Sequence, residues 1–181
     1  LVGAQQAGGK WTTFILDGET GSRDQKTAKD TGDVGVGAHL TVGDDGTWHV
    51  SYVSGLDESL RYLSVTAGKA GTPEVVDNGS GVDGKPFPDG KHVVGDDSWV
   101  VPQGSGLAIY YQDATAGTLR VATSAQAAGG RTWTLKTLVQ PNKFAGFFPS
   151  VVAGEPKVVN FWRQTDKATK DIVGDVTLVQ P

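Results

Sequence analysis

The stretch GDDGTWHVSYVSGLDESLRYLSVTAG, residues 43–68, decides the fold, because it alternates polar and apolar residues between glycine-containing turns. From Thr47 to Tyr52 the alternation has a period of two, which is typical of a β-strand with one face in water. The second half also fits an amphipathic helix, since Leu56, Leu60 and Leu63 fall at i, i+4 and i+7. The stretch alone therefore leaves strand and helix open for its second half.

A second copy of the pattern decides between strand and helix. Residues 102–126, PQGSGLAIYYQDATAGTLRVATSAQ, also contain an apolar strand that ends in a tyrosine, with a Leu-Arg pair eight residues later. Its final part, Thr118 to Thr123, alternates strictly after an Ala-Gly turn and is typical of a strand. The matching residues Leu60 to Val65 are therefore also expected to form a strand.

A third and more divergent unit is AGEPKVVNFWRQTDKATKDIVGDVTLV, residues 153–179. Its second strand is expected to end at Phe161, so that Asn160 and Phe161 replace the Ser-Tyr of the first unit. The anchors Tyr52, Tyr111 and Phe161 then lie 59 and 50 residues apart. No clear Leu-Arg pair follows, and the third strand of this unit is the least regular.

A fourth strand follows the third in the second unit and at the start of the chain, whereas the third unit has no obvious fourth strand. GGRTW, residues 129–133, continues to Leu138, and GGKW, residues 8–11, continues to Leu16. The similarity extends upstream, because LVGAQQAGGKW at the start of the chain parallels VATSAQAAGGRTW. Residues 1–17 are therefore expected to be the third and fourth strands of a preceding unit.

Four antiparallel strands repeated about every 50 residues are the pattern of a β-propeller blade. The sequence predicts an all-β chain with blades at 34–77, 95–140 and 144–181, the half-blade 1–17, and loop insertions at 18–33 and 78–94. Strands are expected at 10–16, 38–43, 47–53, 59–66, 98–102, 107–112, 118–124, 132–139, 149–153 and 157–163, with almost no helix. Since a propeller needs about four to eight blades, we expect a second polypeptide from a processed precursor, or a second copy, to complete the ring. A truncated fragment is the remaining alternative.

The first unit, Asp-x-Gly-x-x-His-Val-Ser-Tyr followed about eight residues later by Leu-Arg-Tyr, resembles the blades of bacterial extracellular propeller proteins. The match is carried by Asp44, Gly46, His49, Val50, Ser51, Tyr52, Leu60, Arg61 and Tyr62, and in the second unit by Tyr110, Tyr111, Asp113, Leu119 and Arg120. The resemblance covers most of the chain and implies an extracellular or cell-surface location.

Composition excludes several classes of function. The chain has 181 residues, with 16 Lys and Arg against 20 Asp and Glu, and a net charge of -4 argues against nucleic-acid or anionic-lipid binding. Without cysteine there is no disulfide and no thiolate metal site. No apolar run approaches the roughly 18 residues of a membrane span. We expect no cofactor and no metal site, because Asp44-Asp45-Gly46 and Asp96-Asp97 are more typical of hairpin turns than of a calcium loop.

No catalytic motif is recognisable in the sequence. None of the histidines, His39, His49 and His92, stands in a metalloprotease or hydrolase pattern. His49 recurs as Ala108 and Val158 in the other units, which favours a packing residue on a strand face.

Five residues are candidates for ligand binding. Trp99 and Trp162 lie near loops, where an indole ring can stack on a sugar. Asp57, Asp113 and Asp166 each follow a second strand by a few residues, and paired acids about 5 to 10 Å apart perform glycoside hydrolysis. Aspartate is also the natural residue to cap such a turn through its own side chain.

Three functions remain open. The first is an extracellular binding or adhesion module that recognises a carbohydrate or protein through the face bearing the two insertions, since function often sits on elaborated loops. The second is a propeller glycosidase or lyase that uses Asp57, Asp113 and Asp166. The third is a structural assembly subunit whose open sheet edge recruits a partner by strand addition.

Overall fold

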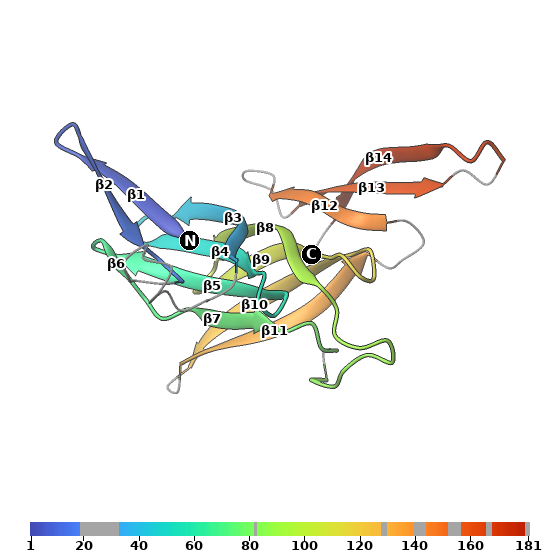
Figure 1. Ribbon diagram of the computed structural model, residues 1–181, viewed down its shortest axis with the longest axis horizontal. Helices are drawn as coiled ribbons and strands as arrows, with labels where there is room; N and C mark the ends of the chain where they lie inside the picture. The colour runs from blue at the N-terminus through green and yellow to red at the C-terminus, as the bar shows by residue number, and fades with distance from the viewer. Residues whose placement is uncertain are drawn as a thin grey trace, which may run out of the picture.

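The computed structural model describes residues 1–18, 33–81, 83–127, 130–139, 144–151, 157–165 and 168–179. All regular structure in these ranges is β-strand, and every neighbouring pair of strands is antiparallel (Figure 1). The expected all-β class is confirmed.

The strands form a hairpin and three sheets that follow one another along the chain. The N-terminal hairpin consists of β1 (Val2–Ala7) and β2 (Lys10–Ile15). Sheet 1 contains β3 (Val34–Val42), β4 (Trp48–Ser54) and β5 (Ser59–Thr66), and both β6 (Lys69–Ala70) and β7 (Glu74–Asp77) pair with β5. Sheet 2 contains β8 (Val94–Gln103), β9 (Gly106–Asp113), β10 (Thr118–Ala127) and β11 (Gly130–Val139). Sheet 3 contains β12 (Phe144–Val151), β13 (Val158–Thr165) and β14 (Ile172–Val179).

The first strand of each sheet begins four or five residues before the expected position, at residues 34, 94 and 144 instead of 38, 98 and 149. Each of these strands contains two register irregularities. Each also has a glycine with positive φ, followed two residues later by a second residue with positive φ; the pairs are Gly35 and Gly37, Gly95 and Asp97, and Gly146 and Phe148. Such bulges break the alternation of side chains, so the pattern of period two is visible only beyond them.

The bulge glycine lets each sheet approach the one before it. A Cβ on Gly95 would lie 2.9 Å from the Cβ of Leu60, at the start of the third strand of sheet 1. A Cβ on Gly146 would lie 3.2 Å from the Cα of Leu119, the corresponding leucine of sheet 2. Leu1 takes the same place against Gly35. The same contact between glycine and leucine is therefore made at all three joints.

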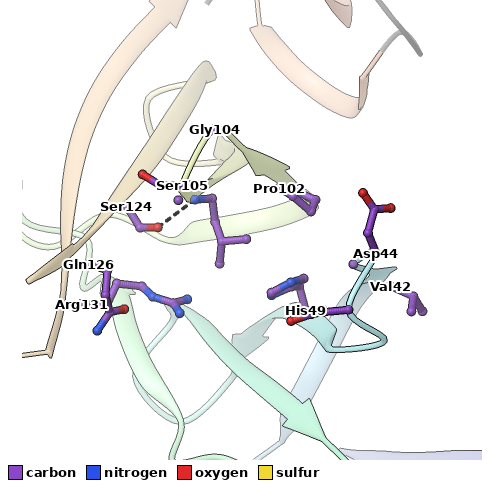
Figure 2. Close-up of a pocket in the computed structure, with 13 residues that line it drawn as sticks. Val42, Asp44, His49, Pro102, Gly104, Ser105, Ser124, Gln126 and Arg131 are labelled. Atoms are coloured by element: carbon purple, nitrogen blue, oxygen red, sulfur yellow. Dashed lines mark hydrogen bonds between the residues drawn. The ribbon is translucent and has the colours of Figure 1, made fainter.

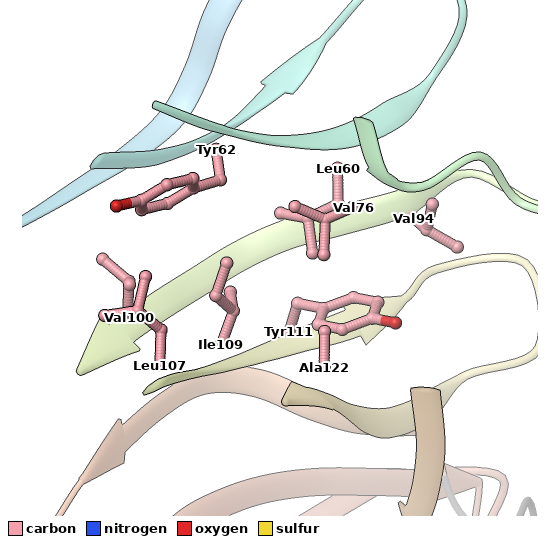
Figure 3. Packing of buried hydrophobic residues seen from close by; sticks show 9 residues of the cluster. All are labelled: Leu60, Tyr62, Val76, Val94, Val100, Leu107, Ile109, Tyr111 and Ala122. Carbon is pink, nitrogen blue, oxygen red and sulfur yellow. The ribbon is translucent and has the colours of Figure 1, made fainter. Parts of the chain in front are cut away.

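A separate hydrophobic core fills each joint. The core between the hairpin and sheet 1 includes Leu16, Val50, Tyr52, Leu63 and Val65. In the core between sheets 1 and 2, residues of β5 and β7 face residues of β8 to β10 (Figure 3). The core between sheets 2 and 3 includes Tyr110, Leu119, Val121 and Val158. The protein is therefore a row of sheets that pack face to face.

Since Tyr52 and Tyr111 are equivalent anchors of the repeat, the sequence predicts that both rings pack between neighbouring units, and both are fully buried. Each faces the preceding layer, where its hydroxyl donates to an aspartate at the end of that layer's last strand. Tyr52 donates to Asp17 over 2.5 Å, and Tyr111 donates to Asp77 over 2.7 Å. In each case the Leu-Arg arginine of the same sheet, Arg61 or Arg120, pairs with that aspartate. These are the joint triads of tyrosine, aspartate and arginine.

The expected register of the third unit is wrong by one residue. Aligning the bulges of β8 and β12 places Asn160, not Phe161, at the position of Tyr111. Asn160 is fully buried, accepts from the N–H of Gly146 over 2.8 Å and donates to Thr177 over 3.2 Å. Phe161 points to the opposite face and is 40% exposed. The expected register aligned the aromatic Phe161 with the tyrosines. Because side chains alternate along a strand, this slip of one residue exchanged the two faces of the strand.

The four tyrosines of the chain give a test of the folded state. Burial raises the pKa of Tyr52, Tyr62, Tyr110 and Tyr111 above the ordinary value of 10.0, and the nearby Asp17 and Asp77 raise the pKa of Tyr52 and Tyr111 further. Since folding favours the neutral phenol, this stabilisation is complete below pH 10 and is lost as the pH rises above it. We expect absorbance at 295 nm to stay flat through pH 10 and to rise only with unfolding.

The control is the same titration in concentrated urea, where all four phenols should ionise near their ordinary pKa. A tyrosine that ionises reversibly near pH 10 while circular dichroism stays unchanged would contradict the burial of that ring.

Candidate functional site

A pocket between sheets 1 and 2, the turn pocket, has a volume of about 580 Å³. It lies where the β3–β4 turn of sheet 1 faces the β8–β9 turn of sheet 2, beside the β10–β11 end of sheet 2 (Figure 2). Sheet 1 contributes residues 42–45 and His49, and sheet 2 contributes residues 102 and 104–107 together with Ser124, Gln126 and Arg131. Its size is that of a small-molecule site.

Arg131 supplies the positive charge of the turn pocket. It is the second residue of β11, opposite Gln126 of β10, and its guanidinium extends toward His49 in Figure 2. The guanidinium carbon lies 4.6 Å from the centre of the Tyr62 ring and 5.7 Å from that of Trp133. Within the described part of the chain, no carboxylate is within ion-pair distance of Arg131, and its buried Nη1 has no hydrogen-bond acceptor. The aromatic rings hold the cation in place without neutralising it.

His49 forms part of the opposite wall. Its Nδ1 lies 2.8 Å from the hydroxyl of Tyr62, so Tyr62 supports both His49 and Arg131. Burial lowers the pKa of His49, and the positive charge of Arg131 lowers it further, while Asp45 acts in the opposite direction. His49 is therefore a neutral ring near pH 7, with hydrogen-bonding capacity but no charge.

Two acids stand at the sheet 1 rim of the turn pocket. Asp45 accepts hydrogen bonds from the N–H and the hydroxyl of Thr47, both over 2.9 Å, and these bonds lower its pKa. Asp44 precedes it in the same turn, and Gly46 follows with a φ of 78°. Asp44-Asp45-Gly46 therefore forms the hairpin turn expected from the sequence. The pocket has a cation on one wall and carboxylates on the other.

Asp113, one of the five candidates, is fully buried. Its Oδ2 lies 2.6 Å from Arg120 and 2.7 Å from Nδ1 of His92, and its Oδ1 accepts from the N–H of Ala116 over 2.8 Å. The oxygens of Asp113 are therefore used to cap the turn and to pair with Arg120 and His92.

Asp57 is also engaged within its own turn. It accepts from Ser59 over 2.7 Å and forms an ion pair of 3.1 Å with Arg61. Asp166 lies outside the described residues. A pair of free carboxylates at glycosidase spacing is therefore not found with Asp57 and Asp113, and the enzyme alternative gains no support from them.

The two candidate tryptophans lie in different sheets. Trp99 of β8 is half-buried and stacks on His39 of β3, with ring centres 4.1 Å apart. Trp162 of β13 is half-buried and pairs with Ala145 of β12. Neither lines the turn pocket, and the structure does not bring them together with Asp57 or Asp113 into one site.

The second insertion, which spans residues 78–94 and is described except for Val82, folds back on itself. The N–H of His92 donates to the carbonyl of Gly79 over 2.8 Å, and the ring of Phe87 stacks on His92 at 3.8 Å. The guanidinium of Arg120 lies 5.4 Å from the Phe87 ring. The insertion therefore covers one end of sheet 2. Of the first insertion, residues 19–32 lie outside the described ranges.

The turn pocket lies at the end of the strands opposite to the insertions. In sheets 1 and 2 the first strand turns into the second, and the third into the strands that follow it, at one end, whereas the insertions connect strands at the other end. A smaller hollow of about 430 Å³ beside the second insertion is lined by residues 75–78, Gly81, Gly84 and residues 133–135. Its acid, Asp77, is already used in a joint triad.

His49, Arg131 and Ser105 were not among the site residues expected from the sequence. They come from β4, from β11 and from the β8–β9 turn, which lie far apart in the chain, and no local motif joins them. A signal was nonetheless present, since His49 replaces the alanine found at the same place in sheet 2, Ala108. A polar residue at an apolar position of a repeat marks a place where one copy has a separate role.

Comparison with protein-family models, curated proteins and solved structures finds no match for this chain. In the described ranges no helix is long and apolar enough to cross a membrane.

Proposed function

We propose that the chain forms consecutive blades of a β-propeller, with the hairpin as half of a preceding blade. The proposal is supported by the three joints, which repeat the contact between the bulge glycine and the leucine and bury one core each. Sheets that stack in sequence with a constant contact are the building plan of a propeller. Further strands, from a second polypeptide or a second copy, complete the ring.

We propose further that this propeller is an extracellular or cell-surface binding module for a carbohydrate or protein ligand, with the turn pocket as its binding site. The observation that carries this assignment is a pocket assembled by turns of two successive sheets around Arg131, a cation that no carboxylate of the described residues pairs with. Polar groups from both sheets converge there, as in preformed ligand sites.

The test is a glycan array of neutral and acidic oligosaccharides, read with the wild-type chain and two variants. Ser105→Trp places an indole in the turn pocket, whereas Lys91→Trp makes an equally bulky change on an exposed residue of the second insertion. We expect Ser105→Trp to reduce the array signal about tenfold or more, because an indole displaces the ligand, and Lys91→Trp to leave it unchanged.

If Lys91→Trp reduces the array signal and Ser105→Trp leaves it unchanged, the ligand binds at the insertion-bearing end and the turn pocket is not its binding site. If the wild-type chain binds no glycan on the array, the carbohydrate form of the proposal is wrong. Thermal unfolding of each variant shows whether a loss of signal comes from loss of fold.

A second candidate function, assembly, is favoured by the exposed apolar faces at both ends of the row. Val2, Trp11 and Ile15 share the outer face of the hairpin, where Trp11 is 67% exposed. Phe161, Val176 and Leu178 share the outer face of sheet 3, where Leu178 is 59% exposed. Apolar faces of this kind are typical of surfaces that another sheet covers.

Sedimentation of the chain tests assembly. We expect the wild-type protein to sediment with a mass above that of one chain. The double variant with Trp11→Ser and Leu178→Ser should sediment as one chain, because serine removes apolar area from both faces. Thr12→Ser, on the inner face of the hairpin, is the control. A well-folded single chain at high concentration would contradict association between copies.

A further inference from the structure

The charge of the turn pocket restricts its ligand. Arg131 contributes one positive charge, Asp44 and Asp45 contribute two negative charges at the other rim, and His49 is neutral near pH 7. A phosphate dianion would need more positive charge than one arginine beside two carboxylates supplies. A ligand with a single negative charge, directed to Arg131 and away from the two aspartates, suits this distribution.

The orientation of Arg131 restricts the anion further. The guanidinium carbon of Arg131 lies over the Tyr62 ring, 4.6 Å from its centre, and the Tyr62 hydroxyl lies 2.8 Å from Nδ1 of His49. Because the Tyr62 ring fixes Arg131 and no carboxylate of the described chain is in reach, the N–H groups of its guanidinium that line the pocket remain for a ligand. A guanidinium presents parallel N–H donors, which match the two oxygens of a carboxylate.

The other side chains of the pocket suit hydroxyl groups. Ser105, Ser124 and Gln126 are neutral and can both donate and accept hydrogen bonds. The carboxylates of Asp44 and Asp45 accept only, so the part of the ligand facing them must donate. A ring that carries several hydroxyls meets both requirements.

We infer that the turn pocket binds a sugar acid, whose carboxylate pairs with Arg131 and whose hydroxyls face Asp44, Asp45 and the neutral side chains between them. The inference rests on the proposed binding function and narrows its ligand class.

Isothermal titration calorimetry of the whole chain with D-glucuronate, D-glucose and L-glutamate tests this ligand class. D-glucose lacks the carboxylate, and L-glutamate has the single net negative charge of D-glucuronate but carries an ammonium group and a second carboxylate in place of the hydroxyls. Arg131→Gln removes the charge, Arg131→Lys keeps the charge but removes the paired donors, and Arg163→Gln is the matched control on sheet 3, outside the pocket.

We expect D-glucuronate to bind at least about tenfold more tightly than D-glucose or L-glutamate, since a bond between charged groups contributes about that factor. Both Arg131 variants should weaken D-glucuronate binding about tenfold or more, with Arg163→Gln unchanged. The sugar-acid inference is wrong if D-glucuronate does not bind, if D-glucose binds with equal affinity, or if L-glutamate binds more tightly. It is also wrong if the folded Arg131 variants bind D-glucuronate with wild-type affinity.

The glycan array separates this failure from failure of the proposed function. If D-glucuronate does not bind but an array signal is lost in Ser105→Trp, the turn pocket is a binding site for another ligand and only the sugar-acid inference is wrong. If the array signal is also absent, the proposed carbohydrate binding is wrong as well.

Discussion

Replacing Arg120 by methionine is expected to lower the free energy of unfolding by about 3–5 kcal/mol. Arg120 is 4% exposed and lies 3.1 Å from Asp77 and 2.6 Å from Asp113, two carboxylates whose side chains are fully buried. Without the guanidinium, two buried acids lose the cation that compensates them. Urea unfolding followed by tryptophan fluorescence measures the loss.

Arg61→Met is the matched control, because Arg61 holds the same place in sheet 1. Its side chain is 21% exposed, and it pairs with Asp57 and, at 3.8 Å, with Asp17 near the surface. Solvent screens such pairs, and we expect a loss of under about 1 kcal/mol. Similar losses for the two variants would contradict the difference in burial between the two joints.

The second large effect is expected for Gly95→Ala, which should destabilise the protein by about 3 kcal/mol or more. Gly95 has a φ of 102°, and a Cβ there would lie 2.9 Å from the Cβ and 3.0 Å from the Cα of Leu60. The variant therefore combines backbone strain with a clash against the backbone of sheet 1, which has to move away.

Gly104→Ala separates the two causes. Gly104 also has positive φ, 57°, but a Cβ there would have no neighbour within 4 Å. We expect it to cost only about 1 kcal/mol, the price of the left-handed conformation for a residue with a side chain. Thermal unfolding of both variants shows whether the joint, and not the backbone conformation alone, requires glycine at position 95. Equal losses would show that the close approach of the two sheets is unimportant.

The strands of sheets 1 and 2 were predictable from the sequence because their side chains alternate and their anchors repeat. Tyr52 and Tyr111 recur with a Leu-Arg pair at a constant distance, so their burial between layers followed from the pattern. The residues before the alternating part of each first strand were not predictable in this way, since the bulges at Gly35 and Gly95 interrupt the period of two. The sequence signal for these bulges was a glycine followed closely by a second glycine or another turn-forming residue.

The third sheet and the turn pocket escaped prediction for different reasons. In sheet 3 the buried anchor is Asn160, a polar residue, and the neighbouring Phe161 resembled the tyrosines more closely. The turn pocket joins His49 of sheet 1 to Arg131 of sheet 2, and only the packing of the two sheets brings them together. The sequence around a residue in its own strand does not reveal which residues of another sheet it will face.

The joint triads have a consequence for the order of the units. Each tyrosine takes its acceptor from the unit before it: Tyr52 from Asp17 and Tyr111 from Asp77. At the next joint Val139, which pairs with Leu119 as Asp77 pairs with Leu60, stands in the aspartate position, and the following unit presents Asn160. A rearranged chain with sheet 2 placed after another copy of itself would bury a tyrosine hydroxyl against valine, at a cost of about 1–3 kcal/mol. The units are therefore not interchangeable. Their order along the chain is encoded in the match between the residue at the end of one unit's last strand and the buried anchor in the second strand of the next unit.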